Sequence, residues 1–184
     1  MLRAPLSAPG LAAATLAVVL LDQASKLLVV LERLVGPTTV IPGFLNLLYR
    51  ENRGGAWGLL SGAPEWFRMP FFVGSSVLAV GFLLWLRRKM LVQRPWIDWA
   101  FPMILGGAVG NLIDRVRLGY VIDFIDMHLA TAHWPTYNVA DVGITVGVML
   151  LVFDSLVGPG APARPGRADA PPPASGPPGS AGRG

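Results

Sequence analysis

Four apolar runs, separated by polar connections, constrain the fold of this chain most strongly. They cover residues 11–31, 66–86, 97–113 and 141–157, and each is close to the roughly 20 residues that a helix needs to cross a bilayer. The composition agrees, because 53% of the 184 residues are hydrophobic and only 14% are charged, whereas soluble domains carry about 25% charged residues. The sequence therefore predicts a mainly α integral membrane protein with four transmembrane helices.

The first run could instead be a signal peptide, because Arg3 precedes an apolar stretch of suitable length. A signal peptide should continue into a small-residue cleavage site. Here the polar residues 22–26 follow, and the apolar pattern then resumes up to residue 31. We therefore expect a first span that is retained in the mature protein.

The segments between the spans differ in character. Residues 36–60 contain short β-like pieces punctuated by glycine and proline, which is typical of a small extramembrane sheet. Residues 114–140 form a second polar connection, for which we expect an outer-face helix or loop. In residues 158–184, 8 of 27 residues are Pro and 7 are Gly, so we expect a disordered tail. The folded membrane domain thus spans residues 1–157.

The distribution of charge predicts the orientation of the chain. Basic residues cluster at 87–94, between the second and third runs, and others flank both ends. The positive-inside rule places that loop and both termini in the cytoplasm, and both long connections outside. The net charge of +4 is accounted for in this way, so we expect no nucleic-acid partner. The chain has no Cys, which excludes disulfides, thiolate metal sites and a Cys nucleophile.

Asp123 and Asp141 are the strongest candidates for catalysis. Each lies beside an apolar span, where an ionisable side chain is costly and a functional role is the default interpretation. Burial among apolar neighbours should raise the pKa of Asp123, and Asn138 is placed to cap the last helix before Asp141. If the second connection folds back onto the membrane, the two carboxyls meet and share a proton, as in aspartic proteases. The alternative to catalysis is that the two aspartates have structural roles in helix capping and ion pairing.

Other polar residues allow weaker hypotheses. Asp22 and Lys26 share one face of a helix and can form a structural ion pair, or can act near a substrate. A Ser25–Lys26 protease dyad is disfavoured, because adjacent residues on a helix point about 100° apart. Asp114 and Arg115 can pair with each other, or Arg115 can bind an extended peptide.

The two histidines, His128 and His133, are five residues apart in a predicted loop. With Asp126 they would supply three metal ligands at best. Such spacing is weak evidence for a metal site, so two surface histidines are expected, with no metal and no cofactor.

Five short blocks together resemble those of one membrane protein family. The blocks are Asp22-Gln-Ala-Ser-Lys26, residues 52–58 (Asn-Arg-Gly-Gly-Ala-Trp-Gly), residues 106–115 (Gly-Gly-Ala-Val-Gly-Asn-Leu-Ile-Asp-Arg), residues 121–124 (Val-Ile-Asp-Phe) and Asn138-Val-Ala-Asp141. Their order between four spans is similar to that of lipoprotein signal peptidase, or signal peptidase II. The resemblance covers residues 11–157. In the second block, Gly55 and Trp57 stand where the family usually has Ala and Phe, which affects the shape of the substrate groove.

This resemblance implies an aspartyl endopeptidase of the bacterial inner membrane, with its active site near the outer face. Such an enzyme removes the signal peptide of prolipoproteins just before a Cys that carries diacylglycerol, and needs no cofactor. The expected partners are that precursor and membrane lipid, and we expect a monomer. The family's catalytic pair falls on Asp123 and Asp141. Its substrate-binding or supporting positions fall on Asp22, Lys26, Asn52, Gly54, Asn111, Asp114, Arg115, Asn138 and Ala140.

Two other classes of protein remain open at this point. A small transporter or proton-conducting protein would use intramembrane Asp and Lys as a relay, but it would spread carboxylates along its spans. A non-catalytic membrane assembly factor would tolerate replacement of Asp123 and Asp141 by Asn.

Overall fold

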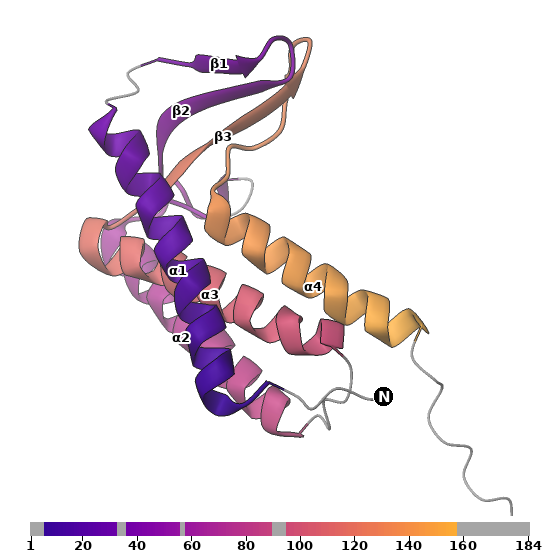
Figure 1. Cartoon of the computed structure of the whole chain (residues 1–184). Helices are drawn as coiled ribbons and strands as arrows, with labels where there is room; N and C mark the ends of the chain where they lie inside the picture. Colours follow the sequence, from indigo (N-terminus) through magenta and orange to yellow (C-terminus); the bar gives the residue numbers. More distant parts are fainter. Residues whose placement is uncertain (1–5, 33–35, 56–57, 90–94, 158–184) are drawn as a thin grey trace, which may run out of the picture.

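The computed structural model describes residues 6–32, 36–55, 58–89 and 95–157. A bundle of long helices carries a small antiparallel sheet at one end (Figure 1). The predicted class, mainly α with a small sheet, is confirmed. The expected disorder of 158–184 lies outside the described residues. The helices are α1 (Ala8–Leu31), α2 (Glu65–Lys89), α3 (Pro95–Leu118) and α4 (Val139–Val157).

Helix α3 lies at the centre of the bundle and packs against α1, α2 and α4. Glycine makes this possible at two adjacent positions. A Cβ at Gly106 would come within 2.7 Å of the Val18 side chain of α1, and one at Gly107 would collide with the carbonyl oxygen of Ala140 in α4. Small residues allow such close approach of helix backbones. Helices α1 and α4 are thereby held against neighbouring faces of α3.

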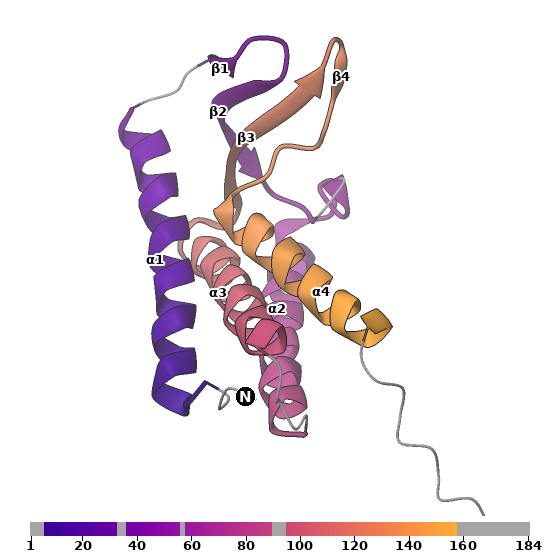
Figure 2. The same ribbon diagram turned by 45° about the vertical axis from the view of Figure 1, so that its right-hand side comes forward.

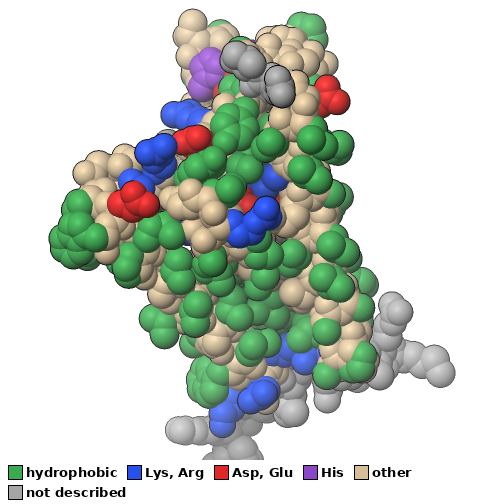
Figure 3. Space-filling view, turned by 90° about the vertical axis from the view of Figure 1, so that its left-hand side faces the viewer, with side chains coloured by type: hydrophobic (Ala, Val, Ile, Leu, Met, Phe, Trp, Pro, Cys, Tyr) green, Lys and Arg blue, Asp and Glu red, His purple; other side chains and the backbone are tan. Residues whose placement is uncertain are grey.

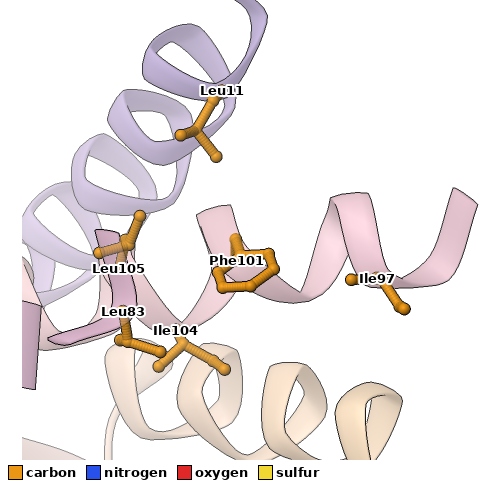
Figure 4. Packing of buried hydrophobic residues seen from close by; sticks show 6 residues of the cluster. All are labelled: Leu11, Leu83, Ile97, Phe101, Ile104 and Leu105. Atoms are coloured by element: carbon orange, nitrogen blue, oxygen red, sulfur yellow. The ribbon is translucent and has the colours of Figure 1, made fainter. Parts of the chain in front are cut away.

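The apolar core of the bundle joins the first three helices. Six buried side chains, contributed by α1, α2 and α3, form this cluster (Figure 4), namely Leu11, Leu83, Ile97, Phe101, Ile104 and Leu105. The outer faces of the bundle are also apolar, with Leu28 at 61%, Leu78 at 75% and Leu156 at 79% exposure. Hydrophobic side chains cover the length of the helices in Figure 3. Apolar exposure on this scale marks a surface that contacts a membrane or another protein.

Helices α1, α2 and α4 are long and apolar enough to cross a membrane, and α3 is not among the described helices that meet this criterion. The third predicted span, 97–113, is therefore not confirmed as one. The reason lies in its composition, because α3 carries Asp98, Asn111 and Asp114 on buried faces. Its polar groups serve contacts inside the bundle.

The sheet has the order β1–β2–β3–β4 with antiparallel neighbours (Figure 2 shows β4). The strands are β1 (Thr38–Ile41), β2 (Leu45–Asn52), β3 (Val121–Leu129) and β4 (Ala132–His133). The first two lie within the predicted cradle, 36–60.

The prediction of an outer-face helix or loop over residues 114–140 is wrong for the central part of that segment. Helix α3 continues to Leu118, and Gly119, at φ +83°, ends it by donating its N–H to the Arg115 carbonyl at 3.0 Å. Glycine adopts this left-handed conformation without penalty. The following segment is rich in β-branched and aromatic residues and forms β3, because β2 provides an edge that satisfies its backbone groups.

Candidate active site

The start of α4 places Asp141. Asn138 is the N-cap: its Oδ1 accepts the Asp141 N–H at 3.0 Å, and Asp141 Oδ2 accepts the Asn138 N–H at 3.2 Å. This reciprocal pair is a capping box, which satisfies two backbone donors that the helix itself cannot. The predicted cap is confirmed. It also fixes the orientation of the Asp141 carboxylate, and α4 begins at the end of the bundle that carries the sheet (Figure 1).

The start of β3 places Asp123, whose side chain is 2% exposed. Asn138 Nδ2 donates to Asp123 Oδ1 at 2.7 Å, and Asn52 Nδ2 donates to Oδ2 at 2.9 Å. The pKa of Asp123 is raised to about 7, because burial and, second, the negative charge of Asp141 outweigh the two amides and Lys26, which lower it. The sequence-based prediction of a raised pKa is thus supported. Near neutral pH this carboxyl can therefore hold or release a proton.

Two asparagines connect the carboxyl groups of Asp123 and Asp141. Asn111 Nδ2, from α3, donates to Asp141 Oδ1 at 2.9 Å, and its Oδ1 accepts from Asn138 Nδ2 at 3.1 Å. Asn138 Nδ2 also donates to Asp123. Asn138 therefore contacts both aspartates, and Asn111 contacts Asn138 and Asp141. These neutral donors orient two carboxyls without supplying a cation to either.

A cluster of three buried charged side chains, called the ion cluster below, contacts Asn111. Lys26 Nζ is 2.8 Å from Asp22 Oδ2 and 2.8 Å from Asp114 Oδ2, and it donates to Asn111 Oδ1 at 3.0 Å. All three charged side chains are at most 3% exposed. The contacts of Asp22 and Lys26 are those of the predicted structural pair, extended by Asp114. Ser25 Oγ donates to the Asp22 carbonyl instead of to Lys26, which argues against a Ser–Lys dyad.

The two acids of this cluster also hold the backbone on which the aspartates stand. Asp22 Oδ1 accepts the N–H of Ala140 at 2.9 Å, and Asp114 Oδ2 accepts the N–H of Ile122 at 3.2 Å. Ala140 precedes Asp141, and Ile122 precedes Asp123. The cluster therefore sets the positions of both aspartates through hydrogen bonds to their preceding residues.

Gln23 is a supporting residue that sequence reasoning missed. Its Nε2 donates to Asp114 Oδ1 at 2.9 Å, to Asp22 Oδ2 at 3.2 Å and to the Gly110 carbonyl at 3.3 Å. Its position in the first apolar run, next to Asp22, was the available signal. An amide in such a run must find internal partners.

Asn52, Gly54 and Arg115 form one edge of the site. Asn52 Oδ1 accepts the Gly54 N–H at 3.0 Å, which shapes the turn after β2. Gly54 is required there, because a Cβ would approach the Leu59 carbonyl oxygen to 2.6 Å. Arg115 Nη2 lies 3.5 Å from the Gly54 carbonyl, and its guanidinium stands 4.9 Å above the Phe72 ring. Every residue named for the site from the sequence thus lies in this network.

The two histidines lie elsewhere, at the far end of β3. They were predicted in a loop, but His128 and His133 face each other across β3 and β4. Asp126 lies beside them, and these three residues form the one group of potential metal ligands found in the described part of the chain. The aspartates of the candidate active site do not belong to this group.

Comparison with known proteins shows the family of this chain. The family model for signal peptidase (SPase) II matches residues 14–157. The lipoprotein signal peptidase of Ralstonia nicotianae is 44% identical over 138 residues, which is 75% of this chain and 79% of the relative. That of Cupriavidus taiwanensis is 45% identical over 141 residues, 77% of this chain and 79% of the relative.

One solved structure, described as a bacterial membrane enzyme determined by the in meso method at 2.3 Å resolution, superposes with a TM-score of 0.73. It is 29% identical, and the match covers 89% of this chain and all of that one. The resemblance seen in the five sequence blocks is therefore confirmed over the folded domain. The chain belongs to the signal peptidase II family.

Proposed function

We propose that this protein is an aspartyl endopeptidase of the bacterial inner membrane that removes signal peptides from prolipoproteins. The observation that carries the proposal is the placement of Asp123 and Asp141 on separate elements, both bonded to Asn138. Lys26, the buried cation nearby, is held by Asp22 and Asp114. The aspartates thus keep carboxyl groups available for proton transfer. Lipoprotein signal peptidase relatives support the substrate class.

The raised pKa of Asp123 favours a division of roles between the two aspartates. Asp141 is the base that takes a proton from water, and the hydroxide formed attacks the scissile carbonyl carbon. Asp123 is protonated and donates its proton to the carbonyl oxygen, which leaves a neutral tetrahedral diol. Asp141 then returns its proton to the amide nitrogen, the C–N bond breaks, and Asp123 recovers its proton from the diol. General acid–base transfer of this kind contributes about 10²- to 10⁴-fold to the rate.

The arrangement of the bundle supports a substrate with a lipid anchor. The site lies where the sheet meets the helices, whose outer faces are apolar (Figures 1 and 3). A signal peptide helix packs among the helices while diacylglycerol on the Cys stays in the bilayer. The scissile bond just before that Cys is then held beside the aspartates. Such positioning supplies much of the rate enhancement.

The same arrangement supports the proposed topology. Helix α2 ends in Arg87, Arg88 and Lys89, and basic side chains lie at the end of the bundle away from the sheet as well as nearer to the sheet (Figure 3). The first turn of α1 and the last turn of α4 lie toward that same end (Figure 2). By the positive-inside rule this end faces the cytoplasm. Helix α3, with 24 residues, runs beside the three apolar helices as a fourth span, and the monomer holds a full site.

Cleavage of a lipidated precursor tests this function. The purified chain should release a signal peptide from a diacylglyceryl-modified prolipoprotein, and mass spectrometry should find the lipidated Cys at the new N-terminus. The same precursor without lipid should react at least about 100-fold more slowly, because it loses that positioning. If folded protein cleaves neither precursor, the non-catalytic assembly factor becomes the better account.

The pH profile of cleavage should report Asp123. Since its pKa is raised to about 7 and its protonated form is the acid, kcat/KM should fall as the pH rises through about 7. Asn52→Ala removes a donor that favours the ionised form, so it should move this limb to higher pH. Glu51→Gln is the matched control, because Glu51 pairs with Arg53 at the surface. If kcat/KM of Asn52→Ala falls over the same pH range as that of wild type, Asp123 is not the acid.

A further inference from the structure

A second cluster of ionisable side chains lies at the opposite end of β3 from the catalytic aspartates. His128 of β3 and His133 of β4 are direct partners across the antiparallel pair. Asp126 is two residues before His128 on the same strand, so both side chains project from one face of the sheet. The register therefore brings three potential metal ligands from two strands together.

The distances within this cluster suit a shared ion. One donor atom from each of the three side chains lies within 4.8 Å of the other two. His133 Nδ1 is 2.9 Å from Asp126 Oδ1, and His128 Nδ1 is 4.0 Å from Asp126 Oδ2. Ligands at about 2.0–2.1 Å from a tetrahedral ion stand roughly 3.3 Å apart. The distances of 2.9 Å and 4.0 Å lie on either side of this value, and the His133 side chain, which is 53% exposed, has room to rotate toward a shared ion.

Two of the three ligands are already held in place. Asn46 of β2 donates its Nδ2 to Asp126 Oδ2 at 3.2 Å and lies 3.5 Å from His128 Nδ1. The backbone N–H of His128 donates to the Phe44 carbonyl at 2.9 Å. The side chains of Asp126 and His128 are 7% and 12% exposed. The bond from Asn46 to Asp126 is an outer hydrogen bond of the kind that orients a metal-binding carboxylate and raises affinity.

We propose that Asp126, His128 and His133 bind one divalent transition-metal ion of the zinc and copper class. Two imidazoles and one carboxylate are the donor set that Zn²⁺ uses, with a fourth position open to water. Mg²⁺ and Ca²⁺ prefer sites made of oxygen atoms alone. The ion replaces the proton that otherwise joins His133 to Asp126.

This site is separate from the peptidase chemistry. Asp126 and Asp123 are three residues apart on β3, so their side chains project from opposite faces of the strand. A bound ion links β3 to β4, and through Asn46 it stiffens the tip of the sheet. The metal site can therefore fail its test while the proposed peptidase function stands. The peptidase function can likewise fail its own test while the metal site stands.

Zinc binding by the full chain tests the proposal. The protein would carry a tag without histidine, be freed of metal with a chelator in detergent, and be dialysed against ZnCl₂ with millimolar Mg²⁺ present. We expect one Zn²⁺ per chain. The chain has two histidines and no cysteine, so the site holds every imidazole. His133→Ala and Asp126→Asn should each weaken binding at least tenfold, and Asn46→Ala about 10- to 100-fold.

Glu32→Gln, which removes an exposed carboxylate at the end of α1, is the matched control and should bind as wild type does. His133→Ala should keep its cleavage of lipidated precursor, which shows that the variant is folded. Less than one Zn²⁺ per wild-type chain would overturn the proposal. Retention of Zn²⁺ by both His133→Ala and Asp126→Asn, or displacement by Mg²⁺, would overturn it as well.

Discussion

Asp123→Asn and Asp141→Asn should each lower kcat/KM for a lipidated prolipoprotein by at least about 10³-fold. Each change removes a proton-transfer group, and catalytic groups that act as a unit show losses of this size or more when one is removed. In Asp123→Asn the single amide oxygen keeps one of the two hydrogen bonds donated by Asn138 and Asn52. The measurement is the rate of precursor cleavage under single-turnover conditions in detergent.

The folding of these variants can be checked independently of their activity. Ionised Asp123 is buried, so its raised pKa opposes folding as the pH rises through about 7. Asp123→Asn should therefore unfold at an equal or higher temperature than wild type at pH 8. Asp126→Asn, on the same strand, is the control for activity and should cleave normally. Wild-type cleavage rates in either Asp123→Asn or Asp141→Asn would contradict the proposed mechanism.

Lys26→Met should be the most destabilising single change in the site. It leaves the carboxylates of Asp22 and Asp114 buried without the cation that each contacts at 2.8 Å. Removal of one partner from a buried ion pair costs about 3–5 kcal/mol. Because Asp22 and Asp114 also bond the N–H groups of Ala140 and Ile122, cleavage should fall together with stability. Thermal or denaturant unfolding in detergent measures the effect.

Asp22→Asn is the matched control for Lys26→Met. It keeps an oxygen that can accept the Ala140 N–H, and Lys26 remains paired with Asp114. The loss of stability should therefore be smaller than for Lys26→Met. If Lys26→Met were as stable as wild type, the ion cluster would not be the element that positions the aspartates.

The parts of the structure that depend on local pattern were predictable from the sequence. Apolar length predicted the helices that carry Asp22 and Asp141, and the Asn138 cap followed from residue type alone. The Gly-x-x-x-Gly spacing of Gly106 and Gly110 in α3 is typical of a helix that others approach closely. The five sequence blocks, taken together, identified the family.

The parts that depend on long-range pairing were not predictable in this way. Residues 121–129 were expected in a helix or loop, because their strand conformation depends on an edge supplied by β2, some 70 residues earlier. The direct pairing of His128 with His133 depends on the β3–β4 pairing, which was missed when this segment was expected to be a helix or loop. The role of Gln23 also depends on Asp114, in a different helix.

The central claim, that Asp123 and Asp141 act as a coupled pair, is tested most directly by titrating Asp123. Carbon-13 NMR of labelled aspartate in wild type would follow this carboxyl, assigned by its absence in Asp123→Asn. The account predicts titration near pH 7 in wild type and a lower pKa in Asp141→Asn, because the charge of Asp141 contributes to the shift. The same pKa for Asp123 in both proteins would contradict the account, since the two carboxyls would then not sense each other.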